Sequence, residues 1–364
     1  MRQAPAWDRF GHWPPLPARI LLAAIAALLV LAALPYVGTP GGEASGSASA
    51  GTVPPAPAAG PGRDQDLELY RRIVARIATG DSYYRAAIEE QRARGFPVRP
   101  GLAVRLPMLA VASAWLGPWG LDAAAVLLGL ATLFAWWRRL GEEPGGADRR
   151  PIALLLLVVG TAIAFKPQYL ALHEVWAGVL LALSFALHRR GRWLGSLFAA
   201  ALALAIREHA LPFVLLMAAL ALWNRRWKEA AGWSVVVALF AAGLLAHLAA
   251  VAHYLTPQDR PSPPWLVFRG LDGFASDVVL SSSLYLLPGF LAAPLALLPL
   301  VGWAGWRSAA GAFGTLLYGG YALFLMLAGR ENNFYWALVI TPAYFIGLAF
   351  VPLALRSLWR SARG

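Results

Sequence analysis

The chain has 364 residues, contains no cysteine and has a mean hydropathy of +0.57. Hydrophobic residues make up 59% and charged residues 14%, which excludes a water-soluble globular domain, where charged residues reach about 25%. The absence of cysteine excludes disulfide scaffolds and thiol chemistry. The net charge is +12, but the basic residues occur in small groups between long apolar runs, so the pattern argues against a nucleic-acid partner.

Long apolar stretches follow one another along most of the chain. A membrane-spanning helix needs about 20 mostly apolar residues, and inside a bilayer the backbone must satisfy its own hydrogen bonds. We therefore predict an all-α integral membrane protein with about ten transmembrane helices. The predicted spans are residues 19–37, 120–137, 151–165, 169–187, 193–206, 210–223, 231–253, 283–304, 309–328 and 335–355.

Basic residues gather in alternate connections between these spans. These groups include Arg138 and Arg139, Arg189 and Arg190, and Arg225 and Arg226. The positive-inside rule then places both termini in the cytoplasm and the other connections on the outer side. We predict a multi-pass protein of a bacterial-type plasma (inner) membrane. The first span has a basic leader and is followed by Ala48-Ser49-Ala50, which resembles a signal-peptide cleavage site; its long apolar run favours an uncleaved anchor.

Three segments follow from this topology. Residues 1–37 form the cytoplasmic N-terminus and first span, residues 38–118 a long outside loop, and residues 119–364 the multi-span bundle. The loop begins with a Gly- and Pro-rich tether at 38–63, which is typical of a flexible linker.

The rest of the outside loop has helical patterns. Apolar residues recur at helical spacing over 67–77, and the pattern ends at Thr79-Gly80, so that Asp66 directly precedes the predicted helix. A second amphipathic helix follows over 82–95, and both are typical of helices that lie on a membrane surface. Residues 105–117 form an apolar run too short to span, which ends at Gly117-Pro118 and predicts a juxtamembrane or re-entrant helix.

Ionisable and amide side chains collect on the predicted outer side in four groups. The groups are Asp64, Asp66 and Glu68; Lys166, His173 and Glu174; Arg207, Glu208 and His209; and Arg330, Glu331, Asn332 and Asn333. Each group alone is also consistent with a solvated turn, and Arg207 with Glu208 is consistent with a local ion pair. Ionisable groups at the mouth of a membrane bundle are functional candidates by default. Arginine binds phosphate in bidentate geometry and a carboxylate can accept a proton from a hydroxyl, so the groups favour a substrate with an anionic head and a lipid tail.

The pattern resembles the GT-C superfamily of polytopic membrane glycosyltransferases. The resemblance rests on the acidic motif Asp64-Gln65-Asp66 in the first outside loop, on Tyr70 four residues after Asp66, and on the segment ARIATG over 75–80. It also includes Arg105-Leu106-Pro107 before the juxtamembrane run. The chain departs from the family in the long tether that separates the acidic motif from the first span.

The resemblance implies a sugar transfer that inverts the anomeric carbon, from a polyprenyl-phosphate donor to a hydroxyl on a glycan, lipid or protein acceptor. It implies Asp66 as the catalytic base with Asp64 as its partner or alternative. The implied donor-phosphate residues are Arg207, Lys166 and Arg330. The implied sugar or acceptor contacts are Glu174, His173, His209, Glu331 and Asn332.

No cofactor follows with certainty from the resemblance, although some members of the family need a divalent cation such as Mg²⁺ or Mn²⁺. Two other classes stay open. A secondary transporter or flippase of an anionic or lipid-linked substrate usually places its charges near the bilayer midplane and in repeated halves. A scaffold protein would account for the helices without the one-sided polar groups.

Overall fold

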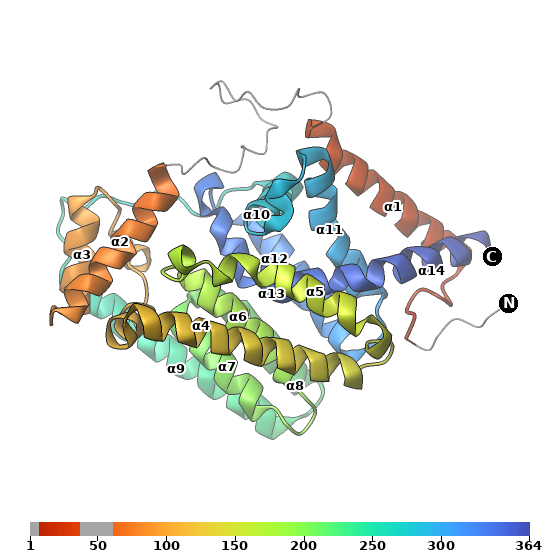
Figure 1. The fold of residues 1–364 in the computed structure, drawn as a ribbon, viewed down its shortest axis with the longest axis horizontal. Coiled ribbons are helices and arrows are strands. Elements are labelled where there is room, and N and C mark those ends of the chain that lie inside the picture. The colour runs from red at the N-terminus through yellow and green to blue at the C-terminus, as the bar shows by residue number, and fades with distance from the viewer. Residues whose placement is uncertain (1–6, 37–60) are drawn as a thin grey trace. The chain divides into compact units, whose positions relative to one another are not determined.

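A computed structural model describes residues 7–36 and 61–364, and within these ranges the chain is helical without a β-strand. The predicted tether therefore lies, up to residue 60, outside the described residues. The chain forms two compact units that interleave in sequence (Figure 1). Of the described residues, unit 1 contains 7–36, 133–163 and 266–364, and unit 2 contains 61–132 and 164–265. The predicted divisions after residues 37 and 118 concern membrane topology and stay predictions.

Five helical segments are long and apolar enough to cross a membrane, which indicates a membrane protein. They are Pro15–Ala33, Gly101–Glu142, Trp227–Ala252, Ala309–Leu327 and Thr341–Arg363. Shorter apolar helices cover His173–Leu187, Leu194–Ile206, Glu208–Trp223 and Gly289–Gly305. The all-helical class is thus confirmed. Ten full spans are not confirmed, because half of the predicted spans fall on helices shorter than 18 residues.

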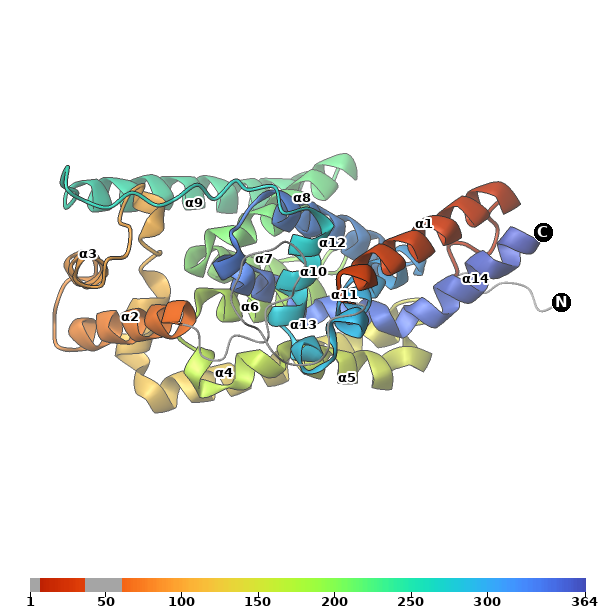
Figure 2. The same cartoon turned by 90° about the horizontal axis from the view of Figure 1, so that it is seen from above.

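Four consecutive helices form the apolar body of unit 2. They are α6 (His173–Leu187), α7 (Leu194–Ile206), α8 (Leu211–Trp223) and α9 (Trp227–Ala252). Helix α6 packs against α7, and α8 packs against α9 (Figure 2). The hydroxyl of Ser184 donates to the carbonyl oxygen of Ser196 at 2.7 Å. This hydrogen bond between two small residues stabilises the packing of α6 against α7, as is common between membrane helices.

A helical hairpin forms the loop part of unit 2. Helix α2 (Pro61–Ala78) and helix α3 (Tyr83–Ala93) are joined by a turn in which Gly80 has φ +96°. A side chain there would be strained, which explains why the helical pattern ends at glycine. Helices are therefore present over both stretches where amphipathic helices were predicted, while their place on a membrane surface stays a prediction. The expected start of the first helix was wrong. Asp66 was predicted to precede this helix, but α2 begins at Pro61 and includes Asp66.

The predicted juxtamembrane helix at 105–117 corresponds to the first part of α4 (Met108–Glu142). The helical geometry of α4 is interrupted at Gly117, which has φ 67° and ψ 177°. Pro118 follows and cannot continue the preceding helical hydrogen bonding. Trp115 and Trp119 flank the break and are 85% and 87% exposed. The predicted interruption of the apolar run at Gly117-Pro118 is therefore confirmed. The boundary between the two compact units falls further along the same helix, after Thr132.

Unit 1 contains the first and the last helices of the chain. Its helices are α1 (Pro15–Ala33), α5 (Arg150–Thr161), α10 (Gly270–Leu280), α11 (Gly289–Gly305), α12 (Ala309–Leu327), α13 (Thr341–Tyr344) and α14 (Val351–Arg363). Helix α11 packs against the 3₁₀ segment η9 (Phe345–Phe350). A Cβ on Gly302 would lie 1.8 Å from the carbonyl oxygen of Gly347, so this approach requires glycine, a device typical of packed membrane helices.

Candidate functional site

Arg207 is the most deeply placed cation of unit 2. It follows the last residue of α7, and its side chain is 1% exposed. Its Nε lies 2.7 Å from Oε1 of Glu174, which is itself 2% exposed, and its Nη1 contacts the carboxylate of Glu208. A buried charge needs a partner because desolvation otherwise costs several kcal/mol per ion. The guanidinium therefore joins the start of α6 to the turn η6 (Glu208–Ala210).

Two histidines lie next to this ion pair. His173 is the first residue of α6 and is buried, and neither of its ring nitrogens hydrogen-bonds a side chain in the described part of the chain. Nε2 of His209 lies 3.9 Å from the Glu208 carboxylate. The starts of α6 and η6 therefore bring carboxylate, guanidinium and imidazole groups together in an otherwise apolar bundle.

Tyr70 and Arg105 connect the loop hairpin with the bundle. Nε of Arg105 donates to the hydroxyl of Tyr70 at 3.0 Å, and the ring of Tyr70 meets the ring of His173 edge to face at 5.3 Å. The hydroxyl of Tyr83 in turn donates to the backbone carbonyl of Arg105. Tyr70 on α2 thus contacts both the segment before α4 and the start of α6.

The electrostatics of Tyr70 place Asp66 in the same group. Burial raises the pKa of Tyr70, the Arg105 guanidinium lowers it, and the carboxylates of Asp66 and Glu174 raise it further. Asp66 and Tyr70 are four residues apart on α2, so they lie on one face of the helix. We call the resulting set the Arg207 cluster. Its members are Asp66, Tyr70, Arg105, His173, Glu174, Arg207, Glu208 and His209.

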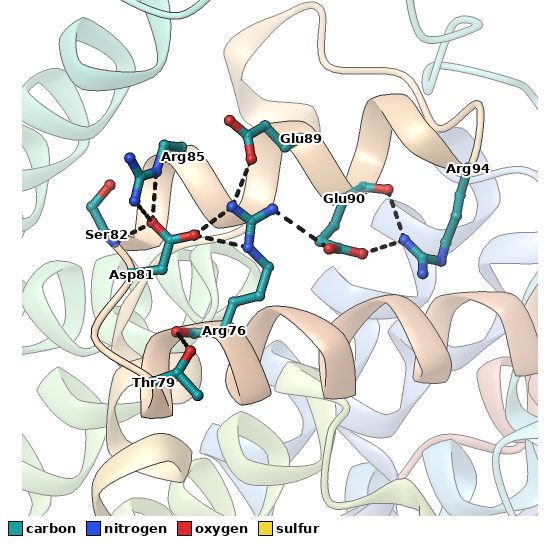
Figure 3. Close-up of polar contacts among 8 residues, drawn as sticks. All are labelled: Arg76, Thr79, Asp81, Ser82, Arg85, Glu89, Glu90 and Arg94. Atoms are coloured by element: carbon teal, nitrogen blue, oxygen red, sulfur yellow. Dashed lines mark hydrogen bonds and ion pairs between the residues drawn. The ribbon is translucent and has the colours of Figure 1, made fainter.

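An ion-pair network between α2 and α3 holds the helix that carries Asp66 and Tyr70. Figure 3 shows Arg76 of α2 among Asp81, Glu89 and Glu90. Nη2 of Arg76 lies 2.6 Å from Glu89 and its Nη1 lies 3.5 Å from Glu90. Burial raises the pKa of Asp81, but its hydrogen bonds with Arg85 and Arg76 outweigh this and lower it. One arginine thus closes the hairpin through three carboxylates.

A second set of contacts ties α3 to α9. Arg92 donates to both carboxylate oxygens of Asp259, at 2.7 and 2.8 Å, and to the carbonyl of Tyr254 at 2.6 Å. His247 of α9 lies 3.3 Å from the hydroxyl of Tyr84 and 3.1 Å from the carbonyl of Val104. His247 is 3% exposed, as expected for a packed core histidine. The hairpin is therefore anchored to the bundle at its far end as well.

Five of the predicted site residues meet in this cluster, namely Asp66, His173, Glu174, Arg207 and His209. Lys166 lies exposed before the short helix Pro167–Tyr169 in the connection ahead of α6. The side chain of Asp64 lies outside the described residues. The predicted residues Arg330, Glu331 and Asn332 belong to unit 1, where their role in a site stays a prediction.

The predicted polar group at residues 330–333 has a local structural role in unit 1. The backbone N–H of Arg330 donates to Oδ1 of Asn333 at 3.1 Å, which caps the 3₁₀ helix η8 (Glu331–Val339). Asn333 is 6% exposed, whereas Glu331 and Asn332 are exposed. The buried amide of this group is therefore Asn333, a residue that was not among the predicted contacts.

Three members of the Arg207 cluster were not among the predicted site residues, namely Tyr70, Arg105 and Glu208. Tyr70 and Arg105 both occur in the motifs of the first loop, and the i, i+4 spacing from Asp66 to Tyr70 could have indicated a shared face. Nothing local in the sequence indicates that Arg105 reaches Tyr70 across 35 residues.

The cluster can perform proton transfer and can bind an anion. It has three carboxylates that can accept protons and two guanidiniums that can hold a phosphate. Among residues 7–36 and 61–364, no three acidic or histidine side chains are arranged to hold a metal ion. No family model matches the chain, and no curated protein or solved structure matches it.

Proposed function

We propose that the protein is a membrane glycosyltransferase that moves a sugar from a polyprenyl-phosphate donor to an acceptor hydroxyl, with inversion at the anomeric carbon. The observation that carries this proposal is the Arg207 cluster. The side chains of Arg207 and Glu174 are almost completely buried in a mostly apolar bundle. Burying an ion costs several kcal/mol unless it is paired. Such groups inside a membrane protein are functional candidates by default, and their chemistry agrees with the resemblance to GT-C enzymes.

In the proposed reaction, Asp66 is the base. Its carboxylate takes the proton from the acceptor hydroxyl while the hydroxyl oxygen attacks the anomeric carbon. The bond from that carbon to the phosphate oxygen breaks, and its electron pair leaves with the lipid phosphate. This transfer forms one carbon–oxygen bond and breaks one, so it needs no redox partner. General-base catalysis of this kind contributes about 10²–10⁴-fold in rate.

The proposed cations for the leaving phosphate are Arg207 and Arg105. Arg207 already has the carboxylates of Glu174 and Glu208 as partners, so a phosphate would share its planar guanidinium with them. Arg105 is only partly buried and sits between Tyr70 and the bundle. Lys166 of unit 2 stays a further candidate for the donor phosphate, whereas Arg330, Glu331 and Asn332 belong to unit 1 and stay predictions from the sequence alone.

We propose in addition that the four shorter apolar helices and α5 also cross the membrane, which together with the five longer segments gives ten spans and places the cluster at the outer, periplasmic face. Reporter fusions at Ala147, Arg190 and Arg226 should then read as cytoplasmic, and fusions at Gln258 and Asn332 as external. A single reversed site among the five would contradict this topology, because it would move one connection to the opposite face.

The direct experiment supplies the purified protein with polyprenyl-phosphate sugars labelled in the sugar, together with a mixture of cell-envelope glycans and lipids as acceptors. We expect label to leave the donor lipid and to appear in an acceptor. The rival function is transport of an anionic or lipid-linked substrate. If the label crosses a vesicle membrane while it remains attached to its lipid, the protein is a transporter or flippase and the proposal is wrong.

A further inference from the structure

Three arginines form an exposed stripe on the last helix of unit 1. Arg356, Arg360 and Arg363 follow helical spacing on α14, and all three are exposed. Trp359 lies on the same stripe at 55% exposure, and the guanidinium of Arg363 lies 4.7 Å from the centre of its ring. Within the described residues, no carboxylate forms an ion pair with these three arginines. The opposite face of α14 is buried through residues such as Ala354 and Leu358.

Helix α1 extends this basic surface. Helix α1 packs against α14 (Figure 2), and Nε of Arg19 donates to the carbonyl of Ala362 at 2.7 Å. The first turns of α1 therefore lie beside the last turn of α14. Arg19 therefore adds positive charge beside Arg360 and Arg363 at the C-terminal end of α14.

The pKa values of two further arginines in unit 1 respond to the charge of another arginine. Burial lowers the pKa of Arg9, and the charge of Arg307 lowers it further. Burial also lowers the pKa of Arg149, and the charge of Arg356 adds to that effect although Asp148 opposes it. The charge of Arg356 thus acts on a second arginine of unit 1, and the exposed stripe on α14 is open to an anion from outside the protein.

The apolar surroundings indicate that this anion belongs to a lipid. Helix α1 is one of the candidate membrane spans, and its Leu16 and Ile20 are 67% and 61% exposed on either side of Arg19. Long arginine side chains near the end of a membrane span can reach the headgroups while their apolar stems stay beside such exposed apolar residues. Tryptophan is enriched at the same level, which agrees with the position of Trp359.

We propose that the stripe formed by Arg356, Trp359, Arg360 and Arg363, together with Arg19, binds the headgroups of anionic phospholipids. This inference does not depend on the proposed enzymatic reaction. Basic residues next to a membrane surface each favour anionic lipid by about fivefold, so three arginines together should discriminate strongly between anionic and zwitterionic headgroups.

The test uses the purified full chain in a neutral detergent and counts bound lipids by native mass spectrometry. Phosphatidylglycerol and phosphatidylcholine with the same acyl chains serve as the two probes. The wild-type chain should prefer phosphatidylglycerol, and the triple variant Arg356→Gln, Arg360→Gln, Arg363→Gln should bind it at least about tenfold more weakly. The matched control removes three exposed arginines from the loop hairpin of unit 2, namely Arg71, Arg72 and Arg85, and should retain the preference.

A second variant protects the test against misfolding. Replacing the same three arginines of α14 by lysine keeps the charge and should keep the preference for phosphatidylglycerol, because surface attraction depends on charge more than on shape. The proposal is overturned if the wild type shows no preference, if the glutamine triple variant keeps it, or if the control loses it equally. Displacement of phosphatidylglycerol by a single-stranded RNA would also overturn it, since the stripe would then be a nucleic-acid surface.

Discussion

Arg207 in unit 2 and Arg360 in unit 1 show how burial changes what the same side chain does. Arg207 is 1% exposed and contacts two carboxylates. Arg360 is exposed on α14, and its Nε donates to the backbone carbonyl of Arg356 at 3.4 Å. A buried guanidinium holds its surroundings together because its loss leaves an unpaired carboxylate, whereas an exposed one contributes little to stability and can attract a ligand. Net charge alone does not distinguish these roles.

The largest effect that this comparison predicts is on stability. Arg207→Gln should destabilise the protein by about 3–5 kcal/mol, since it leaves Glu174 buried without its cation. Arg360→Gln is the matched control and should change stability by no more than about 0.5 kcal/mol. Thermal and denaturant unfolding in detergent measure both. Equal effects of the two variants would contradict the distinction between buried and exposed arginines.

The next effect in size depends on pH. Arg92 holds the pKa of Asp259 at about 2, below its ordinary value. Because this pKa is lower in the folded chain than in the unfolded one, the ion pair stabilises the fold above about pH 4. That contribution is lost as the pH falls through about 2.

Its size should be about 1.5–3 kcal/mol, as for a hydrogen bond to a charged group. Unfolding temperatures measured between pH 6 and pH 2 check it in the wild type and in Arg92→Gln. The variant should be less stable at pH 6 and should lose less stability on acidification. An identical acid response in both proteins would show that Asp259 does not depend on Arg92.

The smallest effect concerns the contact between the loop hairpin and the bundle. Tyr70→Phe removes the hydroxyl that accepts from Arg105 at 3.0 Å, at a cost of about 1 kcal/mol. If Arg105 takes part in donor binding, this variant should lower kcat/KM for the labelled donor by about fivefold. Tyr84→Phe, which removes a hydroxyl near His247 instead, is the control and should leave turnover unchanged. The reverse order of effects would place the reaction away from Tyr70.

Periodicity and charge were sufficient to predict the helical class and the principal breaks of the chain. The Gly80 turn and the interruption at Gly117-Pro118 were readable because glycine and proline have local conformational requirements. The number of helices that cross a membrane was less readable, because helices such as Leu194–Ile206 are shorter than the roughly 20 residues that a span needs. The start of α2 was misplaced, since residues 61–65 lack the apolar spacing that marks the rest of that helix.

The candidate site was predictable where chemistry and position coincide along the chain. Glu174, Arg207 and His209 could be selected because ionisable residues are rare within apolar runs. The contact between Arg105 and Tyr70 depends on how the hairpin folds back on the bundle, which no local pattern specifies. The role of Asn333 was missed for the same reason. The sequence presents it as one of four adjacent polar residues, whereas in the structure it is the buried cap of η8.

The most direct test of the proposed reaction is the turnover of Asp66→Asn. This substitution preserves the shape of the side chain and removes its ability to accept a proton. The matched control is Glu68→Gln on the same helix, which removes a carboxylate that pairs with Arg72 at the surface. We predict that Asp66→Asn lowers sugar transfer by about 10²–10⁴-fold with an unchanged unfolding temperature, while Glu68→Gln keeps nearly full activity. Near-normal transfer by Asp66→Asn would contradict the account.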